Sequence, residues 1–243
     1  MKKILYPVIT VLIFWSCSEI KDWSDPKDTT PPGKIIGPEY QSLPGGARIT
    51  FKLPNDNDIL GVKAIYSYKD GDETREVFSS ALRDTIELFG FPDTQERSVS
   101  LICMDKSRNE SEPVTLIIKP STPPVQIIRE SFKLLPTFGG VFASWKNEYN
   151  SDIAISFYAS DPTGQMRFIE NHYSKITNGS LSLRGFENTE RKFQVQIRDR
   201  WGNYSTPYDV TLTPMFEEEI TPRNKSGELL WSYYGWDDRS VEW

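Results

Sequence analysis

Cysteine and histidine are nearly absent from this chain of 243 residues, which contains two cysteines and one histidine. Two cysteines cannot form the disulfide framework that stabilises many small secreted folds, and one histidine cannot build a structural zinc cluster. Only carboxylates remain as metal ligands. We therefore predict no cofactor and no metal centre, and we expect each hydrophobic core to form without such cross-links.

The chain also lacks an excess of basic residues, because 28 Lys and Arg face 34 Asp and Glu, with a sequence pI near 5.0. Nucleic-acid binding depends on clustered cations that release counterions from phosphates, so nucleic acid is excluded as a partner. No spacing identifies a Ser or Asp partner for His172, and none fixes two carboxylates across a cleft. We predict no catalytic residue and no enzymatic activity.

No hydrophobic run is long enough to span a membrane. The apolar stretch Ile4–Trp15 follows two lysines and has about a dozen residues, the length of a signal-peptide core. It leads into Ser16 and Cys17, which resemble the lipoprotein-processing box in its loose Bacteroidetes form. The alternative, a plain secretory signal with a buried thiol, is disfavoured because Ser18–Thr30 is polar. The sequence thus predicts a signal peptide over residues 1–16 and lipidation of Cys17, which would attach the chain to a membrane.

A polar tether over residues 17–32 follows the lipidated cysteine, and its prolines make it semi-rigid. Glu19 and Asp22 resemble the acidic signal that sends such lipoproteins to the outer surface. We predict an outer-membrane location facing the cell exterior.

An internal repeat with an offset of 94 residues organises the rest of the chain. Gly45-Gly46 recurs as Gly139-Gly140, and Pro120 recurs as Pro214. A repeat of this kind indicates two copies of one structural unit. We predict a first module over 33–120, a second over 121–214 and an aromatic tail over 215–243.

Both modules contain short runs of strand-forming residues separated by turns, several with period-two alternation. Opening strands are predicted at Lys34–Tyr40 and Val125–Phe132, and no helical period is apparent. About seven strands per module indicate an all-β fold of two tandem immunoglobulin or fibronectin-type-III-like sandwiches.

Five motifs follow one another along the first module: Leu53-Pro54, Val62–Tyr66, Gly90-Phe91, Met104-Asp105 and Asn109–Pro113. Their order resembles that in a family of Bacteroidetes surface lipoproteins. Members carry tandem fibronectin-like domains of unknown function, lie beside glycan-uptake (polysaccharide utilisation) systems, and usually continue into a discoidin-like domain presumed to bind carbohydrate. That third domain is expected to be missing here. The resemblance implies oligosaccharide and outer-membrane glycan importer components as partners.

The repeat also separates residues that the shared fold needs from residues that serve something else. Trp201 aligns with Ser107, and Tyr204 aligns with Glu110, so the fold demands neither aromatic residue. Sugar rings stack on exposed aromatic faces, and we predict that Trp201 and Tyr204 bind glycan; burial against the neighbouring module or the tail is the alternative.

Other candidate sites are less specific. The tail contains Trp231, Tyr233 and Trp236, which either begin a third domain or dock on the second module. Thr29 and Thr85 follow aspartates and resemble O-glycosylation acceptors of this phylum. A solvated loop is favoured over a calcium site at Asp56–Asp58, because the second module lacks that spacing.

Two functions stay open from the sequence. The first is a non-catalytic accessory of glycan capture and uptake, which the resemblance favours. The second is a structural spacer or protein-interaction module with no ligand of its own. Exposed aromatic residues that the two modules do not share favour binding.

Overall fold

The computed structural model describes residues 28–68 and 74–217. The predicted lipidation site Cys17 and the tail residues Trp231, Tyr233 and Trp236 lie outside this part. Within the described ranges, no helix is long and apolar enough to cross a membrane.

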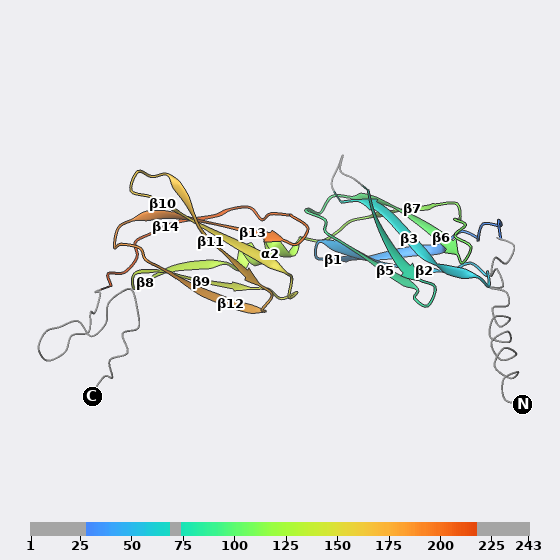
Figure 1. Ribbon diagram of the computed structural model, residues 1–243, viewed down its shortest axis with the longest axis horizontal. Helices are drawn as coiled ribbons and strands as arrows, with labels where there is room; N and C mark the ends of the chain where they lie inside the picture. The colour runs from blue at the N-terminus through green and yellow to red at the C-terminus, as the bar shows by residue number, and fades with distance from the viewer. Residues whose placement is uncertain (1–27, 69–73, 218–243) are drawn as a thin grey trace, which may run out of the picture. The chain divides into compact units, whose positions relative to one another are not determined.

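Seven strands form a first β-sandwich. They are β1 (Ile36–Leu43), β2 (Gly46–Lys52), β3 (Ile59–Ser67), β4 (Thr74–Ser80), β5 (Thr85–Phe89), β6 (Arg97–Asp105) and β7 (Val114–Ile118). One sheet has the order β1-β2-β5 and the other β4-β3-β6-β7 (Figure 1). Period-two alternation places Ile49 and Phe51 in the core, while Thr50 faces solvent.

Seven further strands form a second sandwich of the same design. They are β8 (Lys133–Thr137), β9 (Gly140–Lys146), β10 (Ile153–Ser160), β11 (Met166–Ser174), β12 (Asn178–Arg184), β13 (Arg191–Asp199) and β14 (Tyr208–Leu212). The sheets have the orders β12-β9-β8 and β11-β10-β13-β14. The fold is therefore all-β, with two immunoglobulin or fibronectin-type-III-like sandwiches as predicted.

The predicted opening strand Val125–Phe132 is wrong, because this segment forms the helix α2 (Pro124–Ser131). Prolines at the start of the segment have no N–H groups to lose and are preset for the first helical turn. Val125 and Ile128, one turn apart, are both buried in the second core. The first strand of the second sandwich is instead β8, which pairs antiparallel with β9.

The repeat is visible at the level of single hydrogen bonds. Asn109 donates its N–H and Nδ2–H groups to the carboxylate of Asp105, each at 2.8 Å. Asn203 does the same to Asp199, each at 2.9 Å. Both are Asx turns, and each closes the end of one of the two central strands of a four-stranded sheet.

The chain divides into two compact units whose bounds do not follow the repeat. Residues 42–47 and 89–96, at the ends of β1 and β5, belong by their contacts to the unit that contains the second sandwich. Contacts of these segments with residues after 119 are therefore internal to that unit.

The Cys103 thiol is buried in strand β6, opposite Val62 of strand β3. Burial, together with the nearby carboxylate of Asp56, raises the pKa of Cys103 to about 11. At pH 8 only about one molecule in a thousand then carries the reactive thiolate.

In a Cys17→Ser background, we expect iodoacetamide to alkylate Cys103 of the native protein at least about a hundredfold more slowly than Cys103 of the urea-unfolded chain. Equal rates, measured by mass spectrometry, would contradict this.

Candidate functional site

The candidate site is a row of four residues across the outer face of the β11-β10-β13-β14 sheet. Ala154 of β10 lies opposite Tyr173 of β11 on one side and opposite Arg198 of β13 on the other. Arg198 in turn forms a β-bridge with Tyr204. Directly opposed residues point to the same face with their Cβ atoms about 5 Å apart, so the four side chains are neighbours.

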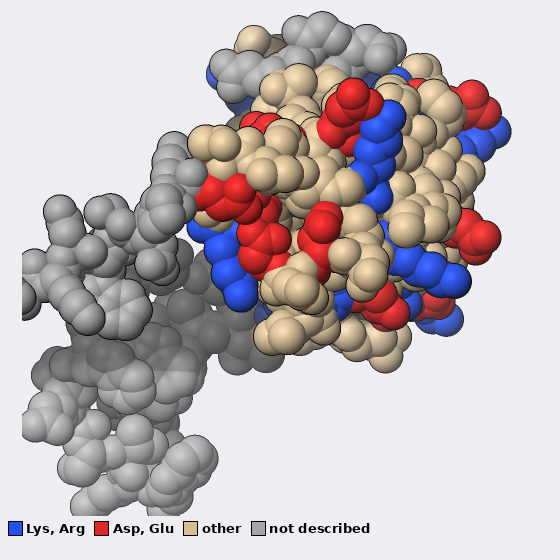
Figure 2. Space-filling view, turned by 90° about the vertical axis from the view of Figure 1, so that its right-hand side faces the viewer, with Lys and Arg blue, Asp and Glu red and all other residues tan. Residues whose placement is uncertain are grey.

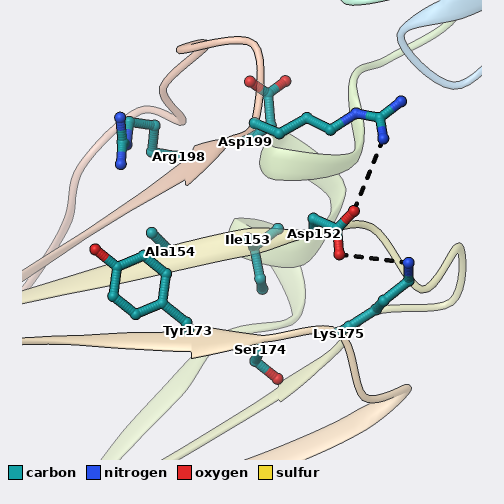
Figure 3. A pocket seen from close by; sticks show the side chains of 9 residues that line it. Asp152, Ile153, Ala154, Tyr173, Ser174, Lys175, Arg198 and Asp199 are labelled. Carbon is teal, nitrogen blue, oxygen red and sulfur yellow. Dashed lines mark ion pairs between the residues drawn. The ribbon is translucent and has the colours of Figure 1, made fainter.

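Alternation along strand β10 explains why this face is open. Ile153, Ile155 and Phe157 belong to the core and are at most 4% exposed, whereas Ala154 and Ser156 point to the other face, where the flanking side chains leave Ala154 only 6% exposed. The outward residues are small, so they leave a depression between the longer side chains of the flanking strands. A hollow of about 430 Å³ lies at one end of this face, and Ala154, Tyr173 and Arg198 are among the residues that line it (Figure 3).

Tyr173 lines this hollow, and Tyr204 lies at the other end of the row, beside Arg198. Tyr173 is 69% exposed and Tyr204 is 57% exposed. Figure 3 shows Tyr173 and Arg198 on either side of Ala154. Aromatic rings at this spacing, with Ala154 and Arg198 between them, can each offer a face or an edge to one ligand lying across the sheet.

A second row of polar residues lies beside the first. Ser156 is opposite Asn171 on β11 and opposite Gln196 on β13. The Ser156 hydroxyl donates a hydrogen bond of 2.7 Å to Asn171 Oδ1. Amide and hydroxyl groups both donate and accept hydrogen bonds, which is the chemistry that sugar hydroxyls require.

Charges around the hollow are unevenly paired. Asp152 is held by Lys175 at 3.4 Å and by Arg200 at 3.9 Å. Asp199 accepts its hydrogen bonds from the Asn203 turn and is buried. Within the described residues, Arg198 has no carboxylate within ion-pair distance, so its guanidinium is available to a ligand.

The first sandwich has the same geometry with different chemistry. The equivalent bridge there joins Met104 to Glu110, and Glu110 forms an ion pair with Lys63. The row is thus a property of the fold, whereas the exposed tyrosine beside an unpaired arginine is found in the second copy.

Trp201, one of the two predicted glycan-binding residues, is half-buried. Its ring stacks on Phe89 with the centroids 6.3 Å apart, and the Arg200 guanidinium lies 4.4 Å from its centroid. Asn203 Nδ2 donates to the Gly90 carbonyl oxygen at 3.0 Å in the same compact unit. These contacts give Trp201 a structural role, while Tyr204 remains exposed. Glycan binding by either residue stays a prediction.

The predicted O-glycosylation acceptors differ in accessibility. Thr29 is exposed, whereas Thr85 is half-buried in strand β5, where its carbonyl accepts a 2.8 Å hydrogen bond from Ser79 Oγ. A glycosyltransferase would reach Thr29 more easily. Modification of both threonines stays a prediction.

Three carboxylates of the first sandwich come together at Asp28, Asp58 and Asp105, with one oxygen of each within 4.8 Å of the others. Asp56 is not part of this group, and its carboxylate accepts the Gly33 N–H at 2.8 Å. Both oxygens of Asp105 already accept hydrogen bonds from Asn109, so the Asx turn accounts for its burial.

Figure 2 shows Asp and Glu interspersed with Lys and Arg on one face of the molecule, with no continuous basic patch among the residues described there.

Tyr173 and Arg198 were not singled out from the sequence. Tyr173 lies near the end of β11, which extends to Ser174. Arg198 aligns with Met104 at the repeat offset of 94, so the comparison that identified Tyr204 could also have identified this charge. Their juxtaposition depends on strand pairing, which the sequence does not display.

Tandem fibronectin-type-III-like sandwiches define the class of protein. Two domain families match the chain: Domain of unknown function (DUF4959) over residues 32–120 and Domain of unknown function (DUF5126) over residues 121–223. No curated protein sequence matches it.

Several solved structures are similar. The SusE-like protein BT2857 shares 28% sequence identity at a TM-score of 0.35, over 40% of this chain and 33% of that chain. The chain thus spans about a third of the length of that protein. The FN1–FN3 domains of chicken CNTN1 share 13% identity at a TM-score of 0.33, covering 76% and 68% of the two chains. A two-domain fibronectin type-III segment from chicken tenascin shares 14% at a TM-score of 0.34, covering 74% and 98%.

Proposed function

We propose that this protein is a non-catalytic surface lipoprotein that captures glycan for an outer-membrane uptake system. In this proposal the outer face of the β11-β10-β13-β14 sheet contacts the sugar. The observation that carries it is the row Tyr173, Ala154, Arg198 and Tyr204, in which two exposed rings flank a small residue and a free guanidinium.

The chemistry of this face suits a sugar better than an apolar partner. Aromatic rings stack on the C–H faces of a pyranose, while the side-chain amides of Asn171 and Gln196 can form hydrogen bonds with its hydroxyl groups. An open sheet face also accepts a chain that continues beyond the site at both ends. This matches the capture of a polymer before its import.

Lipidation of Cys17 would hold this face at the cell surface, and the tether over residues 17–32 would lift it away from the bilayer. The family resemblance of the motifs supplies the link to a glycan importer. Catalysis is not part of this proposal. The His172 ring packs edge-on against the Trp145 ring, with the two centroids 5.5 Å apart.

Stacking on two rings contributes only a few kcal/mol, so one such face binds at roughly millimolar to high micromolar strength. Weak binding is sufficient for a collector that must also release its cargo. Many copies on one cell surface would act together on one polymer through multivalency.

We expect affinity electrophoresis against a panel of polysaccharides to retard the wild-type chain in at least one gel. Tyr173→Ala and Tyr204→Ala should each weaken retention about three- to tenfold, because each removes one stacking surface. The double variant should migrate as it does in a gel without polysaccharide.

Phe142→Ala is the matched control, since Phe142 is an exposed aromatic residue (38%) on strand β9 of the other sheet. It should leave retention unchanged. No retention by any polysaccharide, or equal retention of wild type and the double variant, would overturn the proposed site. The structural spacer would then be the favoured function.

A further inference from the structure

We propose that this sheet face selects acidic sugars, whose carboxylate or sulfate group binds Arg198. This inference rests on the proposed function and names the class of glycan that the site takes. It is carried by the state of the Arg198 side chain and by the charges that surround it.

Arg198 differs from every other described arginine of the second sandwich. Each of the other five forms an ion pair, a hydrogen bond or a ring contact; they are Arg129, Arg167, Arg184, Arg191 and Arg200. Arg198 is exposed and has none among the described residues. Its neighbours across the sheet are Ala154 and Tyr204, and neither offers a charge.

The other charges that line the hollow do not compete for Arg198. Asp152 is neutralised from the far side by Lys175 and Arg200, and Figure 3 shows both ion pairs directed away from Arg198. Asp199 is buried, with its oxygens occupied by the Asn203 turn. Three cations and two carboxylates therefore leave this hollow net positive, in a chain whose formal net charge is −6.

A guanidinium presents a planar fork of N–H groups that matches the two oxygens of a carboxylate or sulfate. With Tyr173 on one side and Tyr204 on the other, a pyranose can stack on a ring while its anionic substituent lies on Arg198. A neutral sugar would stack equally well, but the guanidinium would then form hydrogen bonds only with water and not with an anionic group. The geometry thus favours uronic acids and sulfated sugars over neutral ones.

The test compares acidic polysaccharides with neutral ones by affinity electrophoresis of the full chain. The carboxylate arm uses polygalacturonate and alginate, and the sulfate arm uses chondroitin sulfate. The neutral arm uses highly methyl-esterified pectin, galactan and dextran, since methyl esterification removes charge from the same polygalacturonate backbone. We expect retention in at least one acidic gel and at least about tenfold weaker retention on its neutral counterpart.

Arg198→Gln should reduce acidic retention about tenfold or more, and Arg198→Lys should restore part of it. Arg184→Gln is the matched control, because it removes the same charge from strand β12 of the other sheet. It should leave retention unchanged. Raising NaCl from about 50 mM to about 500 mM should weaken wild type more than Arg198→Gln, since salt screens the charged contact and not the stacking.

The outcomes separate the two proposals. Retention by neutral polysaccharides alone would overturn the acidic class and leave glycan capture standing. Acidic retention that survives in Arg198→Gln, or falls equally in Arg184→Gln, would overturn the role of Arg198. No retention in any gel would overturn both, and unchanged thermal melting of each variant would show that folding is not the cause.

Discussion

Cys17→Ala is expected to release the protein from the membrane pellet into the soluble fraction. Membrane attachment in our proposal depends on acyl chains, each buried CH₂ contributing about 0.8 kcal/mol, and no basic surface would replace them. Removal of the signal peptide takes away Lys2 and Lys3, so the mature chain has 26 basic and 34 acidic side chains. An anionic bilayer would repel such a chain.

Ultracentrifugation of cell envelopes, followed by immunoblotting of pellet and supernatant, measures this effect. Wild type should be almost entirely in the pellet and should incorporate labelled palmitate, and Cys17→Ala should do neither. Cys103→Ala is the control for loss of a thiol and should behave as wild type. If Cys17→Ala stayed in the pellet with the same processing as wild type, lipidation at Cys17 would be wrong.

Trp145→Ala is expected to lower the free energy of unfolding by about 3–5 kcal/mol, as for other large aromatic residues truncated in a core. Trp145 is only 3% exposed and stacks on Phe132 with the centroids 6.0 Å apart. The absence of a side chain at Gly179 makes room for its indole, because a Cβ there would lie 2.1 Å from a ring atom. The surrounding strands cannot collapse fully into the space that the indole leaves.

Urea denaturation monitored by circular dichroism measures this change. Phe142→Ala, on the opposite face of the same strand, provides the matched control and should cost less than about 1 kcal/mol. Equal destabilisation by the two variants would contradict the assignment of Trp145 to the core. It would also undermine Phe142→Ala as the control for glycan binding.

Trp201 and Tyr204 illustrate how the repeat can identify a residue without giving its role. Neither position requires an aromatic residue, since the first module has Ser107 and Glu110 there. Trp201 nevertheless stacks on Phe89, whereas Tyr204 lies on the open face beside Arg198. Two unshared aromatic residues in one loop thus have different surroundings, and only Tyr204 takes part in the proposed glycan contact.

The sequence by itself determined the features that depend on local physics. Period-two alternation decided which strand residues enter each core, so the all-β fold and seven strands per module were predictable. The Asx turns at Asp105 and Asp199 were predictable because an Asx carboxylate reaches backbone N–H groups only a few residues away. Helix α2 was missed because eight residues with a short apolar spacing fit a strand as well as a helix, and only the packing of Val125 and Ile128 decides.

The tertiary structure alone decided which residues form the candidate site. Ala154, Tyr173, Arg198 and Tyr204 are spread over about fifty positions of the sequence, and each is ordinary in its own strand or loop. They become neighbours through the register of β10 against β11 and β13. A register shifted by one residue would turn Tyr173 or Arg198 to the other face of the sheet, and register is set by non-local packing of the core. For this reason the proposed glycan-binding face depends on strand pairing rather than on any motif.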